Sequence, residues 1–185
     1  MHDRGRSAKG AVTTPQLIET ARLRLSPLAP GDAAEFHTLM IEPGVRRYLC
    51  DDQIMPREWA DEVIAGSDAN FAAHGWGLWA ARERGAASLR GVAGFMEFFD
   101  PPVLQLLYAL HPSVWGHGFA TEASRALIGD AFDRLGFAQV VAATDPPNTA
   151  SIAVMKRVGL RLVEETIKNG KPAVIYAINR DDWRP

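Results

Sequence analysis

The chain has 185 residues and a formal net charge of −2, which fits one domain with a buried core of its own. The near balance of acidic and basic residues lacks the basic excess of nucleic-acid-binding proteins, so we expect no nucleic-acid partner. No apolar run reaches the roughly 20 residues that cross a bilayer, so we expect no membrane partner either.

One domain is expected to account for nearly the whole chain. Residues 1–16 are polar, small and without periodicity, which predicts a flexible N-terminal tail. Residues 17–185 contain no internal repeat and no second linker, which favours a single domain. The N-terminus lacks the apolar stretch of a secretion signal, and the single cysteine, Cys50, excludes an internal disulfide. We therefore predict a cytoplasmic protein, either a monomer or a homodimer.

The first elements are a strand and two helices. Apolar and polar residues alternate over residues 23–27, which predicts a strand. Asp32 follows a Pro-Gly turn and is expected to cap a helix that runs to about Met40. Pro56 opens a second predicted helix that continues to about Ala73, because proline is tolerated in the first turn.

Three predicted strands follow. They cover residues 77–82, 92–99 and 103–110. Only residues 100–102 separate the last two, so we expect an antiparallel hairpin with a three-residue loop.

The C-terminal part alternates between helices and strands. Helical spacing predicts a long helix over residues 118–135 and a shorter one that Asn148 caps and that runs to about Val158. Strands are expected over residues 139–143, 160–164 and 173–178. This order predicts an α+β fold, a mixed sheet with helices on its faces, and it lacks the regular strand–helix alternation of a doubly wound fold.

The most informative segment lies between a strand and the long helix, over residues 114–123. Gly116 and Gly118 allow unusual backbone angles, so amide hydrogens there can converge on an anion. The first turn of the helix adds unpaired amides and the positive end of its dipole, and Thr121 adds a hydroxyl. This chemistry suits a diphosphate, although a glycine before a helix is commonly only a turn.

Three stretches in the same order resemble one family. Residues 19–25, 108–123 and 144–160 are similar to the opening strand, the cofactor turn and the following helix of the GNAT superfamily of N-acetyltransferases, closest to the Rim-type branch that includes ribosomal-protein N-terminal acetyltransferases. The resemblance implies a GNAT-like, mostly antiparallel sheet flanked by helices. It also implies acetyl-CoA as cosubstrate and an amine as acceptor. No metal is expected, because the five histidines show no metal-ligand spacing.

The resemblance also implies where acetyl-CoA is held. Ala109 and Leu110 would bind the pantetheine arm through their main chain. The diphosphate would be bound by main-chain amides of the turn and the first helical turn, at Gly116, His117, Gly118, Phe119, Ala120 and Thr121. The His117 imidazole could equally be a solvated loop side chain.

The helix after Asn148 is expected to carry the catalytic acid. Asn148 and Ser151 lie three residues apart at the helix start and share a face. By resemblance, Asn148 contacts the pantetheine and Ser151 lies near the sulfur of the thioester. Many relatives have a tyrosine acid where this chain has Met155, which cannot donate a proton. Ser151 is therefore the candidate acid, acting directly or through water.

The general base is harder to locate. Related sequences often have a glutamate where this chain has Gln105, which cannot accept a proton at neutral pH. With a three-residue loop, Glu97 would lie opposite Gln105 and on the same face of the hairpin. We therefore predict that Glu97 is the general base, acting directly or through water. The alternative is that Glu97 is simply an exposed glutamate on the polar face of an edge strand.

The acceptor is only weakly constrained by the sequence. A site with a weak base favours an α-amine, whose pKa of about 7.7–8.0 leaves roughly a tenth of it neutral at pH 7. A protein or peptide N-terminus is thus expected. A small-molecule N-acetyltransferase, acting on an antibiotic, amino acid or polyamine, and a non-catalytic acyl-CoA-binding module remain the alternatives.

Overall fold

The computed structural model describes residues 16–185. The flexible tail predicted for residues 1–16 therefore lies outside the described residues, except for Gln16. The main-chain carbonyl of Gln16 accepts a hydrogen bond from Trp79 Nε1 (3.0 Å), which ties the start of the described chain to the interior. No helix within residues 16–185 has the length and apolar character required to span a membrane.

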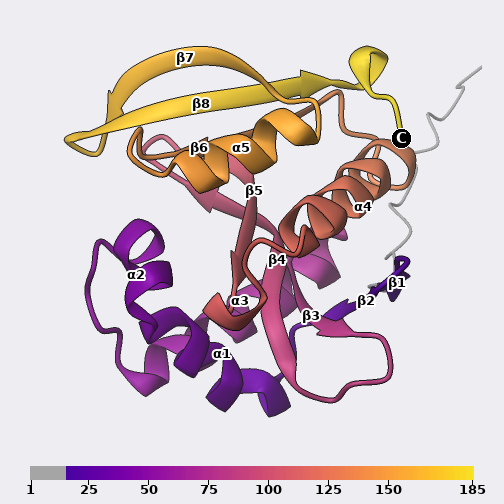
Figure 1. The fold of residues 1–185 in the computed structure, drawn as a ribbon, viewed down its shortest axis with the longest axis vertical. Coiled ribbons are helices and arrows are strands. Elements are labelled where there is room, and N and C mark those ends of the chain that lie inside the picture. The colour runs from indigo at the N-terminus through magenta and orange to yellow at the C-terminus, as the bar shows by residue number, and fades with distance from the viewer. Residues whose placement is uncertain (1–15) are drawn as a thin grey trace, which may run out of the picture.

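Across residues 16–185, five helices and eight strands make up the fold (Figure 1). The strands are β1 (Ile18–Glu19), β2 (Leu23–Pro27), β3 (Leu78–Glu83), β4 (Leu89–Phe98), β5 (Val103–Leu110), β6 (Gln139–Thr144), β7 (Arg161–Lys168) and β8 (Lys171–Asn179). The helices are α1 (Ala33–Ile41), α2 (Pro43–Leu49), α3 (Arg57–His74), α4 (Phe119–Asp133) and α5 (Thr149–Arg157). Short 3₁₀ turns occur at η1 (Pro30–Asp32), η2 (Pro112–Val114) and η3 (Arg180–Asp182).

In the part of the chain that the structure describes, the strands form two antiparallel sheets, one of five strands in the order β1-β2-β3-β4-β5 and one of three in the order β6-β8-β7. Within the described chain, β5 and β6 contact one another without a hydrogen-bonded ladder (Figure 1). The predicted α+β class with a mostly antiparallel sheet is confirmed. The interruption between β5 and β6 places a break in the middle of the molecule.

Side chains of the five-stranded sheet divide between two cores by simple alternation. Leu78 and Ala80 of β3 pack with α1, α2 and α3, whereas their neighbours Trp79 and Ala81 pack on the other face with α4 and the second sheet. Successive residues of a strand point to opposite faces, so one run of apolar residues serves both cores.

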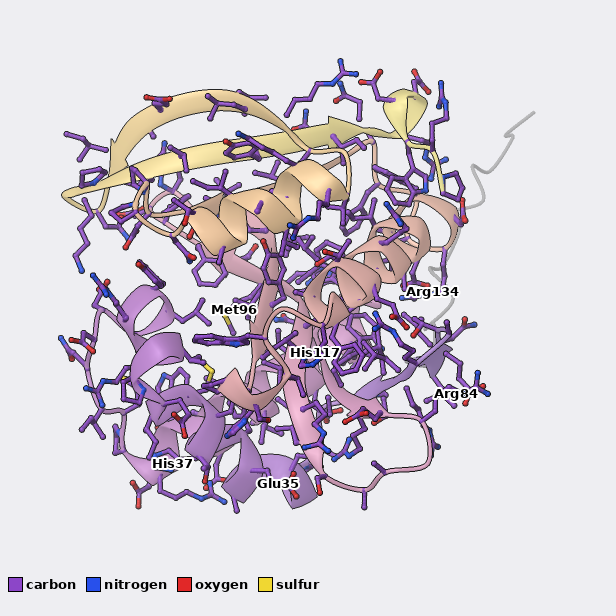
Figure 2. All side chains as sticks on the ribbon, in the orientation of Figure 1. Glu35, His37, Arg84, Met96, His117 and Arg134 are labelled. Carbon is purple, nitrogen blue, oxygen red and sulfur yellow. The ribbon has the colours of Figure 1, made fainter. Side chains whose placement is uncertain are left out.

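The hairpin register differs from the prediction by one residue. Phe99 adopts a left-handed conformation (φ 76°) and leaves the strand, so the loop has four residues and Phe98 pairs with Val103. Consequently Glu97 lies opposite Leu104, and the partner of Gln105 is Met96, which Figure 2 shows in the middle of the molecule. A shift of one residue moves a side chain to the other face of the sheet. The predicted proximity of Glu97 to Gln105 is therefore wrong.

Two smaller features also differ from the sequence prediction. Helix α2 was not predicted, because only Val45 among its residues is buried and its apolar pattern is short. Asp32 precedes α1 but makes no capping bond to it. Its carboxylate instead pairs with Arg82 and accepts a hydrogen bond from the Ala29 amide (3.0 Å), so an ion pair to the sheet replaces the cap.

Candidate active site

A cavity of about 930 Å³ opens where β5 and β6 part, and we call it the central cavity. Its walls come from α2, β5, the turn ahead of α4, the end of β6, and α5. The sequence-predicted residues that line it are Ala109, Leu110, Gly116, His117, Gly118, Phe119, Ala120, Thr121, Asn148 and Ser151. Segments separated by about 40 residues in the chain thus converge on one space.

The turn ahead of α4 has the backbone expected of an anion site. Gly116 (φ 79°) and Gly118 (φ 80°) are both left-handed, a conformation that costs other residues roughly 1–2 kcal/mol. Helix α4 begins at Phe119, and Gly118 gives it no side-chain cap. The first amides of the helix consequently lie at the wall of the central cavity without intrahelical acceptors. Residues present there fit the diphosphate of a nucleotide-type ligand.

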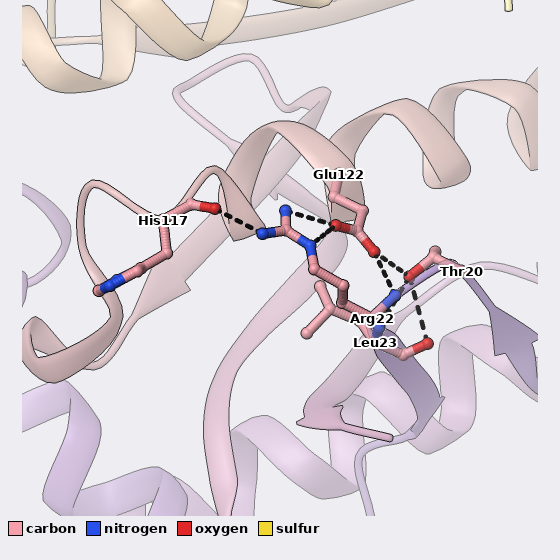
Figure 3. Close-up of polar contacts among 5 residues, drawn as sticks. All are labelled: Thr20, Arg22, Leu23, His117 and Glu122. Carbon is pink, nitrogen blue, oxygen red and sulfur yellow. Dashed lines mark hydrogen bonds and ion pairs between the residues drawn. The ribbon is translucent and has the colours of Figure 1, made fainter.

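An ion pair holds this turn from behind (Figure 3). Glu122 accepts hydrogen bonds from Thr20 Oγ1 (2.6 Å), from the Arg22 amide (2.8 Å) and from Arg22 Nε (2.6 Å). Arg22 Nη1 in turn donates to the main-chain carbonyl of His117 (2.8 Å), and its guanidinium lies 4.6 Å from the centre of the Phe119 ring. The segment between β1 and β2 thereby fixes both the turn and the first turn of α4. We call these contacts the Arg22 clamp.

The Arg22 clamp changes the acidity of Glu122. Burial alone would raise the pKa of this carboxyl, but the hydrogen bonds from Thr20 and Arg22 and the charge of Arg22 outweigh it and lower the pKa. A lowered pKa in the folded state contributes stability above the ordinary carboxyl range, and this contribution is lost as the pH falls through the lowered value.

Replacing Glu122 by glutamine is therefore expected to lower the Tm at neutral pH by a few degrees, about the effect of 1 kcal/mol in a domain of this size. The difference between wild type and variant should shrink as the pH falls through the pKa of Glu122, because both side chains are then neutral. Thermal melts between pH 3 and pH 8 measure it. A difference that stays constant across that range would show that Glu122 acts by packing alone.

The free edge of β5 offers main-chain groups to the central cavity. The His111 amide donates to the Arg90 carbonyl across the β4–β5 pair (2.8 Å). Because main-chain groups alternate in direction along a strand, Ala109 also turns its polar groups toward β4, and Tyr108 and Leu110 turn theirs the other way. The main chain of Ala109, which was predicted to contact the pantetheine arm, therefore faces β4, whereas that of Leu110 faces the free edge of the strand, as does that of Tyr108.

Trp115 occupies part of this edge. Its indole Nε1 donates to the Leu110 carbonyl (2.7 Å), and its ring packs on Gly44 of α2, where a side chain would leave no room. The Leu110 amide and the main-chain groups of Tyr108 and Leu106 lie on the same side of β5, and all three residues line the central cavity. Helix α2, although absent from the sequence prediction, thereby takes part in shaping the central cavity.

Two hydroxyl groups meet across the central cavity. Tyr108 of β5 shares a hydrogen bond with Ser151 Oγ of α5 (2.8 Å) and donates to the Ser151 carbonyl (3.0 Å). Burial raises the pKa of Tyr108 to about 12, although the bond to Ser151 acts in the opposite direction. Tyr108 therefore stays protonated near neutral pH. Sequence reasoning gave Tyr108 no role, even though it opens the second similar stretch.

Asn148 holds the start of α5 as predicted. Its side-chain oxygen accepts from the Ser151 amide (3.2 Å), which is a helix cap. Its Nδ2 donates to Thr144 Oγ1 at the end of β6 (3.0 Å). Both bonds fix the position of Ser151 relative to the strand, and the side chain of Met155 fills the buried side of the same helix.

The predicted base is not brought to this space. Glu97 is exposed and does not line the central cavity, and Gln105 is buried with its Nε2 atom unpartnered among residues 16–185. Because the observed register pairs Glu97 with Leu104, the geometry does not support Glu97 as the general base. Over the described chain, no aspartate or glutamate lines the central cavity.

Comparison with known proteins gives concordant matches. A family model described as an acetyltransferase (GNAT) domain matches residues 22–161. The uncharacterized protein YkkB of Bacillus subtilis (strain 168) is 29% identical over 164 residues, which cover 86% of this chain and 93% of that protein. The FsC-acetyl coenzyme A-N(2)-transacetylase of Aspergillus fumigatus is 36% identical over 86 residues, 41% of this chain and 36% of that one.

Solved structures share the same arrangement of strands and helices. An acetyltransferase from Agrobacterium tumefaciens str. C58 superposes with a TM-score of 0.79 at 23% identity, covering 94% of this chain and 99% of that one. RimL, a ribosomal L7/L12 alpha-N-protein acetyltransferase in complex with coenzyme A, superposes with a TM-score of 0.74 at 19% identity, covering 89% and 98%. At these identities the likeness supports the fold.

Proposed function

The chain belongs to the GNAT acetyltransferase family, and on that premise we propose that it transfers the acetyl group of acetyl-CoA directly to an amine within a ternary complex. The observation that carries the proposal is the central cavity, where an uncapped helix start with two left-handed glycines, a free strand edge and a hydroxyl pair line one space. These are the groups that a diphosphate, an amide-bearing arm and a leaving thiolate require.

Acetyl-CoA is assigned to the central cavity from its diphosphate to its acetyl group. Its diphosphate accepts hydrogen bonds from the amides between Gly116 and Thr121. Its pantetheine arm lies along the free edge of β5 and bonds to main-chain groups of Tyr108 and Leu110. Asn148 and Ser151 lie on the opposite wall, and Ser151 takes the position near the sulfur atom.

The reaction needs a proton at sulfur. A neutral amine attacks the thioester carbonyl, the C–N bond forms as the C–S bond breaks, and the coenzyme leaves as a thiolate. Ser151 Oγ donates a proton to that thiolate, and the Tyr108 hydroxyl, within 2.8 Å of Ser151 Oγ, passes its own proton to Ser151. The nitrogen that has attacked loses its extra proton to water, and water returns a proton to Tyr108, so both hydroxyls are restored.

The acceptor we favour is an α-amine. No carboxylate of the described chain lines the central cavity. Without a carboxylate to take its proton there, the amine must bind in its neutral form. About a tenth of α-amines meet this condition at pH 7, against well under a thousandth of lysine side chains.

With a peptide acceptor, log(kcat/KM) should rise with unit slope and level off at the pKa of the peptide amine, about 7.7–8.0. Exchanging the peptide for an acceptor with a higher amine pKa should move the bend by the same amount. The pH profile of initial rates measures this. A bend that keeps its position when the acceptor is changed would instead report a base on the protein.

A second candidate acceptor is a small-molecule amine. It is favoured by the similarity to the FsC-acetyl coenzyme A-N(2)-transacetylase, which covers 41% of this chain. Thiol release from acetyl-CoA, measured with a peptide N-terminus, an amino acid, a polyamine and an aminoglycoside, separates the candidates. Turnover of the peptide alone supports a peptide N-terminus as the acceptor. Tight acetyl-CoA binding without turnover of any amine would make the chain a binding module.

A further inference from the structure

A second cavity, of about 590 Å³, lies where α5 ends, and we call it the basic cavity. The end of α5, the first residues of β7, the end of β8 and the C-terminal segment form its walls. Of the described residues, five with cationic side chains line it, Arg125, Lys156, Arg157, Arg161 and Arg184, against one carboxylate, Asp182. The chain as a whole carries a net charge of −2, so this concentration of positive charge is local.

The cations of the basic cavity form no ion pair with any residue that the structure describes. Within residues 16–185, none of the five lies within 4.0 Å of a carboxylate, although other arginines of the protein form ion pairs. Like charges that face one concave space repel one another and raise the local concentration of anions. A bound anion with more than one negative charge removes that repulsion.

The shape of the donors narrows the choice of anion. Four of the five cations are arginines, whose planar guanidinium groups bind phosphate oxygens in pairs. The remaining wall is apolar, from Val158, Leu160, Ile178 and Trp183, so an organic group attached to the phosphate has surface to cover. A phosphomonoester, with up to two negative charges and three terminal oxygens, matches this combination.

The basic cavity and the central cavity share one lining residue. Arg157 lines both. Arg125 Nη2 donates to the Arg157 carbonyl (3.2 Å), which holds the end of α5 against α4. A phosphate bound between Arg125 and Arg157 is thus within reach of a ligand that extends out of the central cavity, and is equally open to a free phosphate ester.

We propose that the basic cavity is a phosphomonoester site centred on Arg125 and Arg157. Its occupant is either the 3′-phosphate of the bound coenzyme or a free phosphorylated nucleoside. The first source rests on the proposed function; the second does not.

Calorimetric titrations of CoA and of 3′-dephospho-CoA distinguish the sources, followed by titration of adenosine 3′-monophosphate into protein saturated with 3′-dephospho-CoA. If the coenzyme supplies the phosphate, CoA should bind about tenfold more tightly than 3′-dephospho-CoA. If a free ester is the ligand, the two coenzymes should bind equally and adenosine 3′-monophosphate should bind the loaded protein.

The double variant Arg125→Gln/Arg157→Gln should abolish whichever effect the wild type shows. The control Arg57→Gln removes one positive charge from α3, which lines neither cavity, and should keep the effect. Equal binding of both coenzymes without adenosine 3′-monophosphate binding, or an effect that survives in the double variant, would overturn the proposal. Failure of both coenzymes to bind would overturn the proposed function instead, and adenosine 3′-monophosphate would then test the basic cavity alone.

Discussion

Replacing Ser151 by alanine is expected to lower kcat about a hundredfold while leaving the Kd of acetyl-CoA within about twofold. The hydroxyl is assigned to proton donation at sulfur, a step that follows binding, so its loss should affect the transition state more than the ground state. A thiolate is a fair leaving group even without a proton, which places the effect at the lower end of the range for general acids.

Tyr108→Phe should cost about tenfold in kcat, because Ser151 keeps its hydroxyl but loses the bond that orients it and returns its proton. In the double variant the loss should stay near a hundredfold, because the two hydroxyls act as a unit. The control is Ser124→Ala, which removes a buried hydroxyl of α4 that has no hydrogen-bond partner over the described chain. If the loss of kcat in the double variant equals the product of the two single losses, Tyr108 does not act through Ser151.

The second large effect is expected from Thr121→Glu. The new carboxylate would lie in the first turn of α4, facing the central cavity where the diphosphate is assigned. At about 5 Å and an effective dielectric constant of about 20, one pair of like charges costs about 3 kcal/mol, or about a hundredfold in Kd.

The same substitution should leave the free protein as stable as before or slightly more so, because a negative charge near a helix N-terminus interacts favourably with the helix dipole, by about 0.3–1 kcal/mol. Affinity for CoA and Tm of the free protein are thus predicted to move in opposite directions. Thr121→Gln, similar in size and uncharged, is the matched control and should lose only the contribution of the hydroxyl. Undiminished CoA affinity in Thr121→Glu would remove the diphosphate from this turn.

Local sequence patterns predicted most of the elements that form the site. The glycine spacing before α4, the cap at Asn148 and the strand predicted over residues 103–110 rest on local signals, and the structure contains the corresponding turn, helix and strand. Such features depend on residues close together in the chain, which is why they can be predicted from one sequence.

The features that failed depend on contacts between distant segments. An aromatic residue at position 99 favours a strand, yet its left-handed backbone ends β4 one residue early. Glu97 therefore lies on the opposite face of the sheet from Gln105. The Arg22 clamp joins residues 100 positions apart, and the Tyr108–Ser151 bond joins residues 43 positions apart. The basic cavity collects cations from positions 125 to 184, where no run of charge marks them.

Hydrogen–deuterium exchange of the main-chain amides, with and without CoA, tests most directly whether the turn ahead of α4 binds the diphosphate. Bound CoA is predicted to slow exchange at residues 116–121 and to leave α3 unchanged. Exchange at residues 116–121 that stays the same in protein saturated with CoA would contradict it.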